Sequence, residues 1–386
     1  MLKLQFMRHG MKNICLVVDS FKGSASSIQI ENYLETGIHK ADRNFKVTKI
    51  PITDGGEGFT RILTDYLGGE MHKTEITGAY GRKQIAQWGI ADSKAIIEVA
   101  EAAGLSQRQA GDDPQNATSY GLGKLILKIV KQEKPSEILI GLGGSATNDA
   151  GLGMAEAIGY QFNDENGFSV PALLKNFDQI KSIDNSKVDQ DLKKIKFTGF
   201  ADVVNPLLGE NGATYVYGRQ KGIEIDKMSK IDHQISRVAG IVVNASGHDH
   251  RNDVGSGAAG GLGFGILSFL NGQIVQSMPE MIKMLKIEET VSKNDIVVTG
   301  EGNLDAQSLD GKVSCQIAGI GKQLGVPVIG IVGNTNVEMS KLLDIGFSAV
   351  FTTTVGPKTL EQAVDSIELD AVTTAEQIFR VVGIGK

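Results

Sequence analysis

The stretch Asp295-Ile-Val-Val-Thr299, followed by Gly300-Glu301-Gly302-Asn303-Leu304-Asp305, decides the fold class. Its apolar half predicts a buried parallel strand, and its second half predicts a loop that presents two carboxylates at the end of that strand. Ligands of open α/β sheets bind at this edge of the sheet. Carboxylate oxygens placed there suit a hard cation such as Mg²⁺.

An apolar strand next to a glycine recurs along the chain, and amphipathic helical segments separate the strands. This alternation predicts a parallel sheet with helices on both faces. Ser26 and Gln29 have the spacing of a capping box at the start of one helix. The predicted strands cover residues 13–18, 47–52, 137–140, 295–298 and 327–332, and the predicted helices cover residues 27–40, 120–132 and 360–382.

The middle of the chain has a different pattern. Short strands over residues 72–76, 84–90 and 94–99 follow one another as in a meander, and a polar helix is predicted near residues 227–238. The fold class is therefore predicted as α/β, with a discontinuous Rossmann-like parallel-sheet domain and an inserted second α/β domain. We expect the first domain to comprise residues 11–65, 115–158 and 292–386, and the second to comprise residues 66–114 and 159–291.

The composition limits the classes of partner. A net charge of -6 disfavours nucleic acid or an anionic membrane surface as a partner. The longest apolar stretch, residues 261–270, is too short to span a membrane. Only two cysteines occur, so no disulfide framework is expected, which suits a reducing cytosol. The 48 glycines gather at strand ends, which favours ligand-binding turns.

Two loops follow the first two predicted strands. The loop from Asp19 to Ser24 precedes a helix, and Lys22 adds a full positive charge to the helix N-terminus, so it suits a phosphate or a carboxylate. The alternative is a solvent-exposed lysine in a turn. In the second loop, from Thr53 to Gly58, paired glycines allow close approach to a ligand, and Asp54 with Glu57 suits a metal or a hydroxyl. The alternative is an Asp-Gly turn.

The segment Gly141 to Asp149 allows two interpretations. It follows a strand and matches the spacing GxGxxA, which resembles a dinucleotide fingerprint that opens a helix. However, Ser145, Thr147 and Asn148 crowd the turn with hydrogen-bonding groups, which favours the binding of a phosphate or a small polar substrate.

Two further loops lie in the second half of the chain. Gly255 to Gly263 matches GxGxxG but follows no apolar strand, so it is interpreted as a glycine-lined anion loop, with close helix packing as the alternative. Asp202 and Asn205 end the apolar run 195–200. Asp202 is a candidate general base and Asn205 a candidate metal or phosphate ligand, while an Asx turn before Pro206 is the alternative.

Together these loops resemble the bacterial glycerate kinase family. The motifs that carry the resemblance occur in the family's order: residues 18–24, Asp54-Gly-Gly-Glu-Gly58, Gly143-Gly-Ser-Ala-Thr-Asn-Asp149, residues 202–207, Gln220-Lys-Gly222, Gly257-Ala-Ala-Gly-Gly261 and residues 299–305. The resemblance covers the chain from Met11 onward. It implies a two-domain α/β kinase that uses ATP and Mg²⁺ to phosphorylate D-glycerate, commonly to 2-phosphoglycerate, in a cleft between the domains.

The resemblance also implies roles for individual residues. Asp202 is expected to accept the proton of the substrate hydroxyl, with Asp19 as its rival, and Lys22 is expected to bind a phosphate or the substrate anion. Mg²⁺ is expected on Asp54, Glu301 and Asp305, directly or through water. The expected phosphate- and substrate-binding residues are Ser20, Gly55, Gly56, Ser145, Thr147, Asn148, Asn205, Gly257, Gly260 and Gly261.

Three positions depart from the usual family pattern. Asn303 replaces an arginine, Val204 replaces a second acid, and Arg219 replaces a proline. Two rival functions remain at this point: a dinucleotide-dependent oxidoreductase acting on a small hydroxy acid, and a sugar-acid sensor without catalysis. The carboxylate-rich loops weigh against the sensor, because a sensor gains nothing from acids beside an anionic ligand.

Overall fold

The computed structural model describes residues 12–384, and the chain divides into two compact units. The first unit contains the chain up to Asp54 together with the chain from Met278 onward, and the second unit is Gly55–Ser277. The first unit is therefore built from two separate chain segments. The predicted fold class is confirmed, with a discontinuous parallel-sheet domain and an inserted second α/β domain.

The first unit has a five-stranded sheet in the order β15-β13-β11-β1-β2, and every pairing is parallel. Side chains of β1, β11 and β13 are almost wholly buried, which explains why these strands are continuous apolar runs in the sequence. The strands are β1 (Asn13–Val18), β2 (Lys46–Lys49), β11 (Ile296–Gly300), β13 (Val328–Val332) and β15 (Phe347–Thr352), with a short parallel pair of β12 (Asn303–Leu304) and β14 (Asn334–Thr335).

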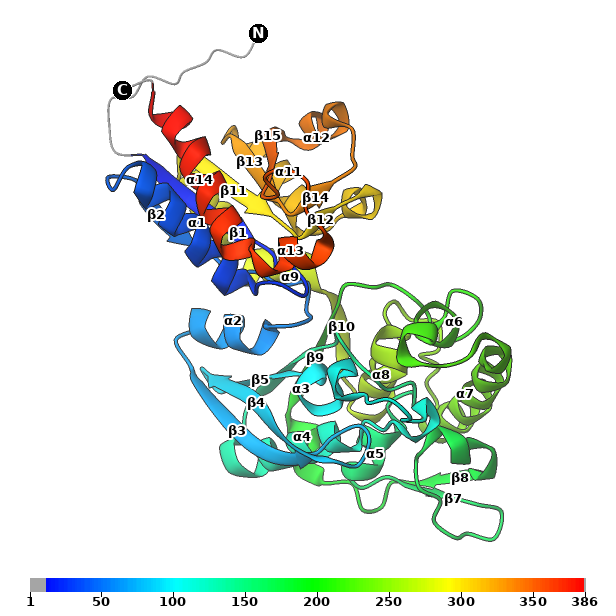
Figure 1. Ribbon diagram of the computed structural model, residues 1–386. Helices are drawn as coiled ribbons and strands as arrows, with labels where there is room; N and C mark the ends of the chain where they lie inside the picture. Colours follow the sequence, from blue (N-terminus) through cyan, green and yellow to red (C-terminus); the bar gives the residue numbers. More distant parts are fainter. Residues whose placement is uncertain (1–11, 385–386) are drawn as a thin grey trace. The chain divides into compact units, whose positions relative to one another are not determined.

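Helices α1 (Ser27–Ala41) and α14 (Ile367–Gly383) lie side by side in the first unit (Figure 1). Gly37 allows their close approach, because a Cβ there would lie 2.3 Å from the Val372 carbonyl oxygen. The predicted capping box of Ser26 and Gln29 is present at the start of α1. The other helices are α9 (Ser277–Met284), α10 (Ile287–Ser292), α11 (Val313–Leu324), α12 (Met339–Ile345) and α13 (Leu360–Asp365).

The second unit has a six-stranded mixed sheet in the order β10-β9-β6-β5-β4-β3. Strands β3, β4 and β5 form the predicted antiparallel meander, and the remaining pairs are parallel. The strands are β3 (Glu70–Thr77), β4 (Lys83–Ala91), β5 (Lys94–Glu98), β6 (Glu137–Gly141), β9 (Lys196–Ala201) and β10 (Gln273–Gln276), with a small antiparallel pair of β7 (Gln161–Asn163) and β8 (Ser182–Asp184).

Helices pack against this second sheet and bury a large apolar core. Figure 1 shows α2 (Phe59–Tyr66) beside β4 and β5, which it contacts. The polar helix predicted near residues 227–238 is the middle of a longer helix, α7 (Ile225–Ser246). The others are α3 (Val99–Ala103), α4 (Tyr120–Glu133), α5 (Leu152–Ala157), α6 (Ala213–Tyr217) and α8 (Ala258–Phe269).

The expected domain boundaries differ from the observed division in three segments. Residues 55–65 and 115–158 lie in the second unit, and residues 278–291 lie in the first. The physical reason for the largest difference is the pairing of β6, which is hydrogen-bonded between β5 and β9. An apolar parallel strand has the same pattern in either sheet, so its sequence does not specify which neighbours it joins.

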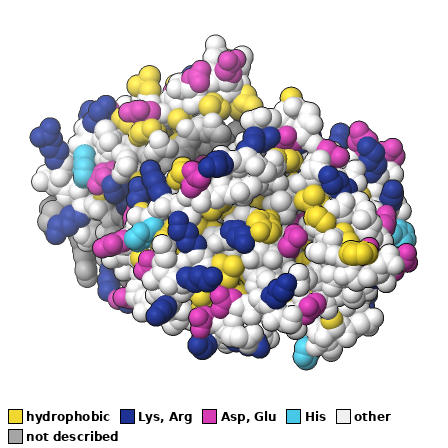
Figure 2. Space-filling model, turned by 90° about the horizontal axis from the view of Figure 1, so that it is seen from below, with side chains coloured by type: hydrophobic (Ala, Val, Ile, Leu, Met, Phe, Trp, Pro, Cys, Tyr) yellow, Lys and Arg dark blue, Asp and Glu magenta, His cyan; other side chains and the backbone are white. Residues whose placement is uncertain are grey.

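Side chains of opposite charge are interspersed on the face of the molecule shown in Figure 2, and hydrophobic side chains occur there in small groups. Within residues 12–384, no helix combines the length and the apolar character that crossing a bilayer requires.

The packing of α2 on β4 generates a test of the fold. Gly89→Ala is expected to lower the free energy of unfolding by about 1–3 kcal/mol through overpacking. A Cβ at Gly89 would lie 1.7 Å from Thr64 Oγ1 and 2.8 Å from Thr64 Cβ. The matched control is Gly240→Ala in α7, where a Cβ would meet nothing within 4 Å and where alanine favours the helix. Urea unfolding measures both variants. Equal midpoints for wild type and Gly89→Ala would contradict this packing.

Candidate active site

In the first unit, predicted site residues gather where β1 and β11 end. Asp19 directly follows β1 and Glu301 directly follows β11, and the two strands pair in parallel with Val18 opposite Gly300. The Asp19 amide donates to the Gly300 carbonyl at 3.0 Å, which extends the ladder by one residue. Both carboxylates are buried. The pairing therefore brings two acids from opposite ends of the chain to one edge of the sheet.

Electrostatic repulsion acts on Asp19. Burial raises the pKa of Asp19 to about 7, and the charge of Asp54 adds to the rise. The Ser20 amide, which donates to Asp19 Oδ1 at 2.7 Å, and the charge of Lys22 oppose this rise, while Glu301 contributes to it. The charges of two other carboxylates thus act on Asp19, and a cation bound beside Asp19 would offset their repulsion.

Lys22 forms an ion pair with Asp54, with Nζ 3.1 Å from Oδ2. The side chain of Lys22 is 75% exposed, so this pair contributes little to stability in solvent. The exposed position leaves the ammonium accessible to an anion in solvent.

Serine hydroxyls and a lysine surround Glu301. The Ser308 hydroxyl donates to Glu301 Oε2 at 3.0 Å, and the Ser314 hydroxyl donates to Oε1. Lys312 Nζ lies 3.5 Å from Glu301 Oε2 and 3.7 Å from Asp305 Oδ1. The sequence analysis missed Ser308, Lys312 and Ser314, because they follow the acidic loop in a segment without a recognisable spacing.

The side chain of Asn303, which stands where the family usually has arginine, joins two loops. Its Nδ2 donates to Asp305 Oδ2 at 3.0 Å, and its Oδ1 accepts from Asn334 Nδ2 at 3.2 Å. Asn303 therefore links the loop after β11 to the loop after β13 through neutral hydrogen bonds, where an arginine would bring a positive charge.

The carboxylate oxygens of the first-unit acids suit a hard cation, but the predicted ligands Asp54, Glu301 and Asp305 do not form one preformed metal site. Asp54 pairs with Lys22, whereas Glu301 and Asp305 both face Lys312. Among the described side chains, no three histidines, cysteines or acids gather as a metal-binding group. Mg²⁺ commonly binds to one or two carboxylates together with substrate phosphates, and Asp19 and Glu301 are buried carboxylates at one edge of the sheet.

In the second unit, the loop between β6 and α5 is buried and firmly held. Asp149 accepts from the Ser119 amide and hydroxyl, both at 2.8 Å, and burial raises its pKa. Lys221 Nζ donates to Ser145 Oγ at 2.9 Å and to the Thr147 carbonyl at 2.7 Å. Asn148 Nδ2 donates to the Thr214 hydroxyl at 3.0 Å. The predicted residues Ser145, Thr147 and Asn148 are thus fixed by side chains distant in sequence.

The glycine-lined loop 257–261 packs directly on this β6–α5 loop. A Cβ at Gly260, where φ is +69°, would lie 1.9 Å from the Thr147 carbonyl oxygen. A Cβ at Gly257 would lie 2.1 Å from the Pro206 carbonyl oxygen. These glycines permit three loops to meet, so the close packing considered as the alternative from the sequence is present. The helix of α8 becomes regular only after Gly261.

Gly55 and Gly56 lie at the same edge of the second sheet. A Cβ at Gly55 would lie 2.4 Å from Ser277 Oγ, and a Cβ at Gly143 would lie 2.3 Å from Gly56 Cα. The buried carboxylate of Glu98, at the end of β5, accepts from the Gly58 and Thr60 amides and so caps α2. Burial raises the pKa of Glu98 to about 7. The sequence analysis did not single out Glu98, since it ends a strand without an adjacent glycine.

Asp202 follows β9 and is exposed. The Tyr217 hydroxyl donates to Asn205 Oδ1 at 2.7 Å, and Asn205 Nδ2 donates to the Asn211 carbonyl at 2.8 Å. Burial raises the pKa of Tyr217, and the charge of Asp202 adds to the rise, which places the two side chains near each other. Asp202 and Asn205 therefore share one neighbourhood, with Tyr217 as a residue that the sequence analysis missed.

The dinucleotide interpretation of Gly141 to Ala146 has no structural support. Such a fingerprint requires a tight turn from the strand directly into a helix, whose N-terminus binds the pyrophosphate. Here β6 ends at Gly141 and α5 begins only at Leu152, with a long buried loop between them. The expectation that this turn opens a helix is therefore wrong, because Asp149 and Lys221 hold the loop in a non-helical conformation.

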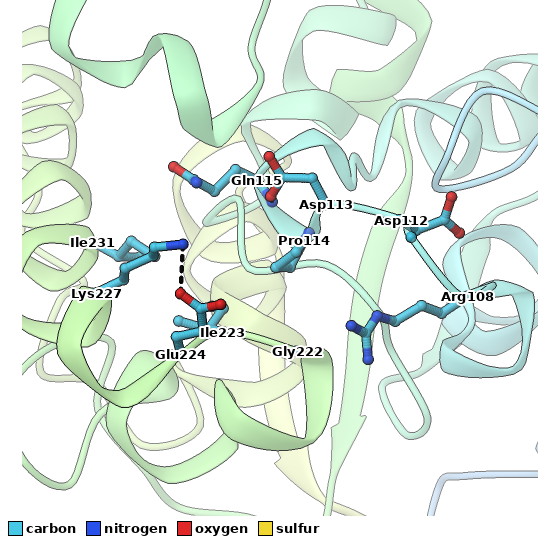
Figure 3. Close-up of a pocket in the computed structure, with 11 residues that line it drawn as sticks. Arg108, Asp112, Asp113, Pro114, Gln115, Gly222, Ile223, Glu224, Lys227 and Ile231 are labelled. Carbon is cyan, nitrogen blue, oxygen red and sulfur yellow. Dashed lines mark hydrogen bonds and ion pairs between the residues drawn. The ribbon is translucent and has the colours of Figure 1, made fainter.

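The second unit also contains a pocket of about 300 Å³, separate from the predicted site residues, none of which lines it (Figure 3). Arg108 and Asp112 lie on one side of it, and Gly222, Glu224 and Lys227 lie on the other. Lys227 is paired with Glu224 at 2.6 Å. The pocket borders Gly222, the residue that follows Lys221.

Comparisons with known proteins agree with the fold. The model of the glycerate kinase family matches residues 14–383. The glycerate kinase of Halalkalibacterium halodurans is 34% identical over 92% of this chain and 93% of its own length, and the glycerate 2-kinase of Escherichia coli is 35% identical over 91% and 92%. A crystal structure of a protein assigned as glycerate kinase 2 from Salmonella typhimurium LT2 has a TM-score of 0.84 and 32% identity, covering 97% of this chain and 99% of that one.

The acid cluster of the first unit generates a prediction for pH dependence. In the unfolded chain Asp19 ionises near 3.8, whereas in the folded protein it ionises near 7. Stability is therefore lost as pH rises from 3.8 to 7 and is not regained above 7. Asp19→Asn removes this loss, so its Tm should exceed that of wild type at pH 8 and match it at low pH, without added metal.

Thermal unfolding at several pH values measures this difference. The control is Asp344→Asn, an exposed aspartate of the first unit, which should follow the wild-type profile. A Tm difference between Asp19→Asn and wild type that is independent of pH would contradict the raised pKa of Asp19.

Proposed function

Because this chain belongs to the glycerate kinase family and is a kinase, we propose that it transfers the terminal phosphate of ATP to a hydroxyl of D-glycerate and forms 2-phosphoglycerate. The family match over residues 14–383 carries the proposal. The relative from Escherichia coli is named a glycerate 2-kinase, which supports the 2-hydroxyl as the acceptor.

We assign the divalent cation to the first unit. Asp19, Asp54 and Glu301 carry the charges that interact there, and Asp305 lies near Glu301 through their shared neighbour Lys312. Bound Mg²⁺ would supply charge neutralisation on the phosphate oxygens of ATP. Ser308 and Ser314 hold the Glu301 carboxylate in one orientation, and Lys22 and Lys312 balance part of the negative charge before ATP binds.

The second unit is proposed to bind the anionic groups and to supply the base. The loops Ser145 to Asn148 and Gly257 to Gly261 present hydroxyl, amide and backbone groups. Hydrogen bonds from Lys221 and Asn148 hold these groups in place, which suits the binding of a phosphate or a carboxylate. Asp202, exposed after β9, is proposed to accept the proton of the attacking hydroxyl. Asn205 is held by Tyr217 and Asn211 in the same neighbourhood, where it would orient the substrate.

We propose that both groups of residues serve one reaction. Phosphoryl transfer requires a nucleotide clamp, a cation and a residue that orients or deprotonates the acceptor. In this proposal the first-unit carboxylates hold the cation, whereas the second-unit loops bind the anionic groups and Asp202 of the second unit accepts the proton. A single-site substitution in either unit should therefore reduce the same activity.

A coupled ADP-release assay with D-glycerate, L-glycerate and related hydroxy acids tests the reaction. D-glycerate with ATP and Mg²⁺ is expected to give the highest kcat/KM, and phosphorus NMR of the product should show a phosphate on the 2-hydroxyl. The absence of ADP release with every hydroxy acid would remove the proposed function. A phosphate on the 3-hydroxyl would overturn only the assigned product.

Asp202→Asn tests the role of the base. The substitution should lower kcat by roughly 10²- to 10⁴-fold and leave KM for D-glycerate within a few-fold of wild type, since the amide keeps the shape but accepts no proton. The control is Glu210→Gln, an exposed acid in the segment after β9, which should retain wild-type kcat. An unchanged kcat in Asp202→Asn would transfer the role to Asp19, the next candidate.

A further inference from the structure

We propose that Lys221 supplies the positive charge with which the loop Ser145 to Asn148 binds an anion. This inference rests on the proposed function, because it assigns a new residue to the same site. Lys221 belongs to the Gln220-Lys221-Gly222 motif, for which the sequence analysis gave no role.

The position of Lys221 is fixed on several sides. Its side chain is 2% exposed, and its Nζ donates to Ser145 Oγ and to the Thr147 carbonyl. A Cβ at Gly260 would lie 2.8 Å from Nζ, so the glycine-lined loop also approaches the ammonium closely. The ammonium therefore touches both loops that are proposed to bind the anion.

The chain reverses directly after this lysine. Arg219–Lys221 form one turn of 3-10 helix, and Gly222 ends it at a φ of +90°. A Cβ at Gly222 would lie 2.2 Å from an Arg108 guanidinium nitrogen, so a larger residue would disturb the turn. The turn keeps Lys221 buried beneath the loop and away from solvent.

The positive charge of Lys221 is not neutralised by a neighbouring acid. Among the side chains that the structure describes, no carboxylate forms an ion pair with it. Asp149 is the acid whose charge acts on it, but the Asp149 carboxylate already accepts hydrogen bonds from Ser119, Gly151 and Gly153. Ser145, Thr147 and Gly260, which face Lys221 from the other sides, do not ionise. An anion bound to the loop would supply the missing negative charge.

A second observation points to a ligand at this loop. Thr147 is fully buried, and its hydroxyl oxygen has no hydrogen-bond partner within the described part of the chain. A buried polar group without a partner is costly unless a ligand or water satisfies it. Lys221 holds the carbonyl of the same residue, so it fixes where this hydroxyl lies. The oxygens of a phosphate or carboxylate would accept from both groups.

The protonation of Lys221 gives the proposal a distinctive consequence. Burial lowers the pKa of Lys221 to about 7. Below this pH the free protein carries the charge, and above it the bound anion must draw a proton onto the amine. Anion affinity that depends on Lys221 should thus be strongest below pH 7 and should weaken as pH rises.

The test compares Lys221→Gln with wild type in steady-state kinetics at pH 6.5 and pH 9. Glutamine can donate to the same acceptors but carries no charge. At pH 6.5 the variant should show a KM for ATP or for D-glycerate that is about ten- to hundredfold higher, as expected for loss of a charge-assisted hydrogen bond. At pH 9, where wild-type Lys221 is largely neutral, the difference in KM should shrink. Lys227→Gln, at an exposed lysine paired with Glu224, is the control and should keep wild-type KM at both pH values.

The outcomes separate this proposal from the proposed function. A wild-type enzyme that releases no ADP with any hydroxy acid would contradict the proposed function. The second outcome concerns an active wild type. If the KM of Lys221→Gln for both substrates is then unchanged, or is raised equally at both pH values, only the assignment of Lys221 is contradicted. If Lys221→Gln does not fold, Lys221→Met, which leaves no polar group to bury, replaces it with the same expected dependence on pH.

Discussion

The parallel pairing of β1 with β11 is the constraint on which the first unit depends. It joins the beginning of the described chain to a segment that follows the whole second unit, with Ile14 opposite Ile296. Because parallel strands end at the same edge, the ladder brings Asp19 and Glu301 together without any local sequence relation between them. The proximity of the acids that are proposed to bind Mg²⁺ is therefore a consequence of this strand pairing.

Both groups of site residues place charge where burial makes it costly. Asp19 keeps a carboxylate beside two others, and Lys221 keeps an amine beneath a loop with no acid bound to it. A protein selected only for stability would replace both with uncharged residues. In the proposed function, a cation bound to the first group and an anion bound to the second would offset this cost. This is the same complementarity that phosphoryl transfer requires.

The sequence alone determined the elements and their order. Continuous apolar runs such as β11 and β13 are buried on both faces, and Ser26 and Gln29 cap α1 as their spacing predicts. These features depend on local pattern and on backbone hydrogen bonding, so they can be derived before any contact is known. The loop residues Asp19 and Glu301 could be named for the same reason, because each directly follows a recognisable strand.

Only the tertiary structure decided which strands are neighbours and which distant side chains hold each loop. The run Glu137–Gly141 is as apolar as a strand of the first sheet, yet its hydrogen bonds to β5 and β9 place it in the second. Ser308 has no signal in the sequence, and Lys221 lies in a recognised motif to which the sequence assigns no role. The contacts of these residues with Glu301 and Thr147 appear only in the tertiary structure. Local sequence pattern specifies the secondary structure of a segment, whereas long-range packing specifies its contacts. The chemistry of this site depends on those contacts.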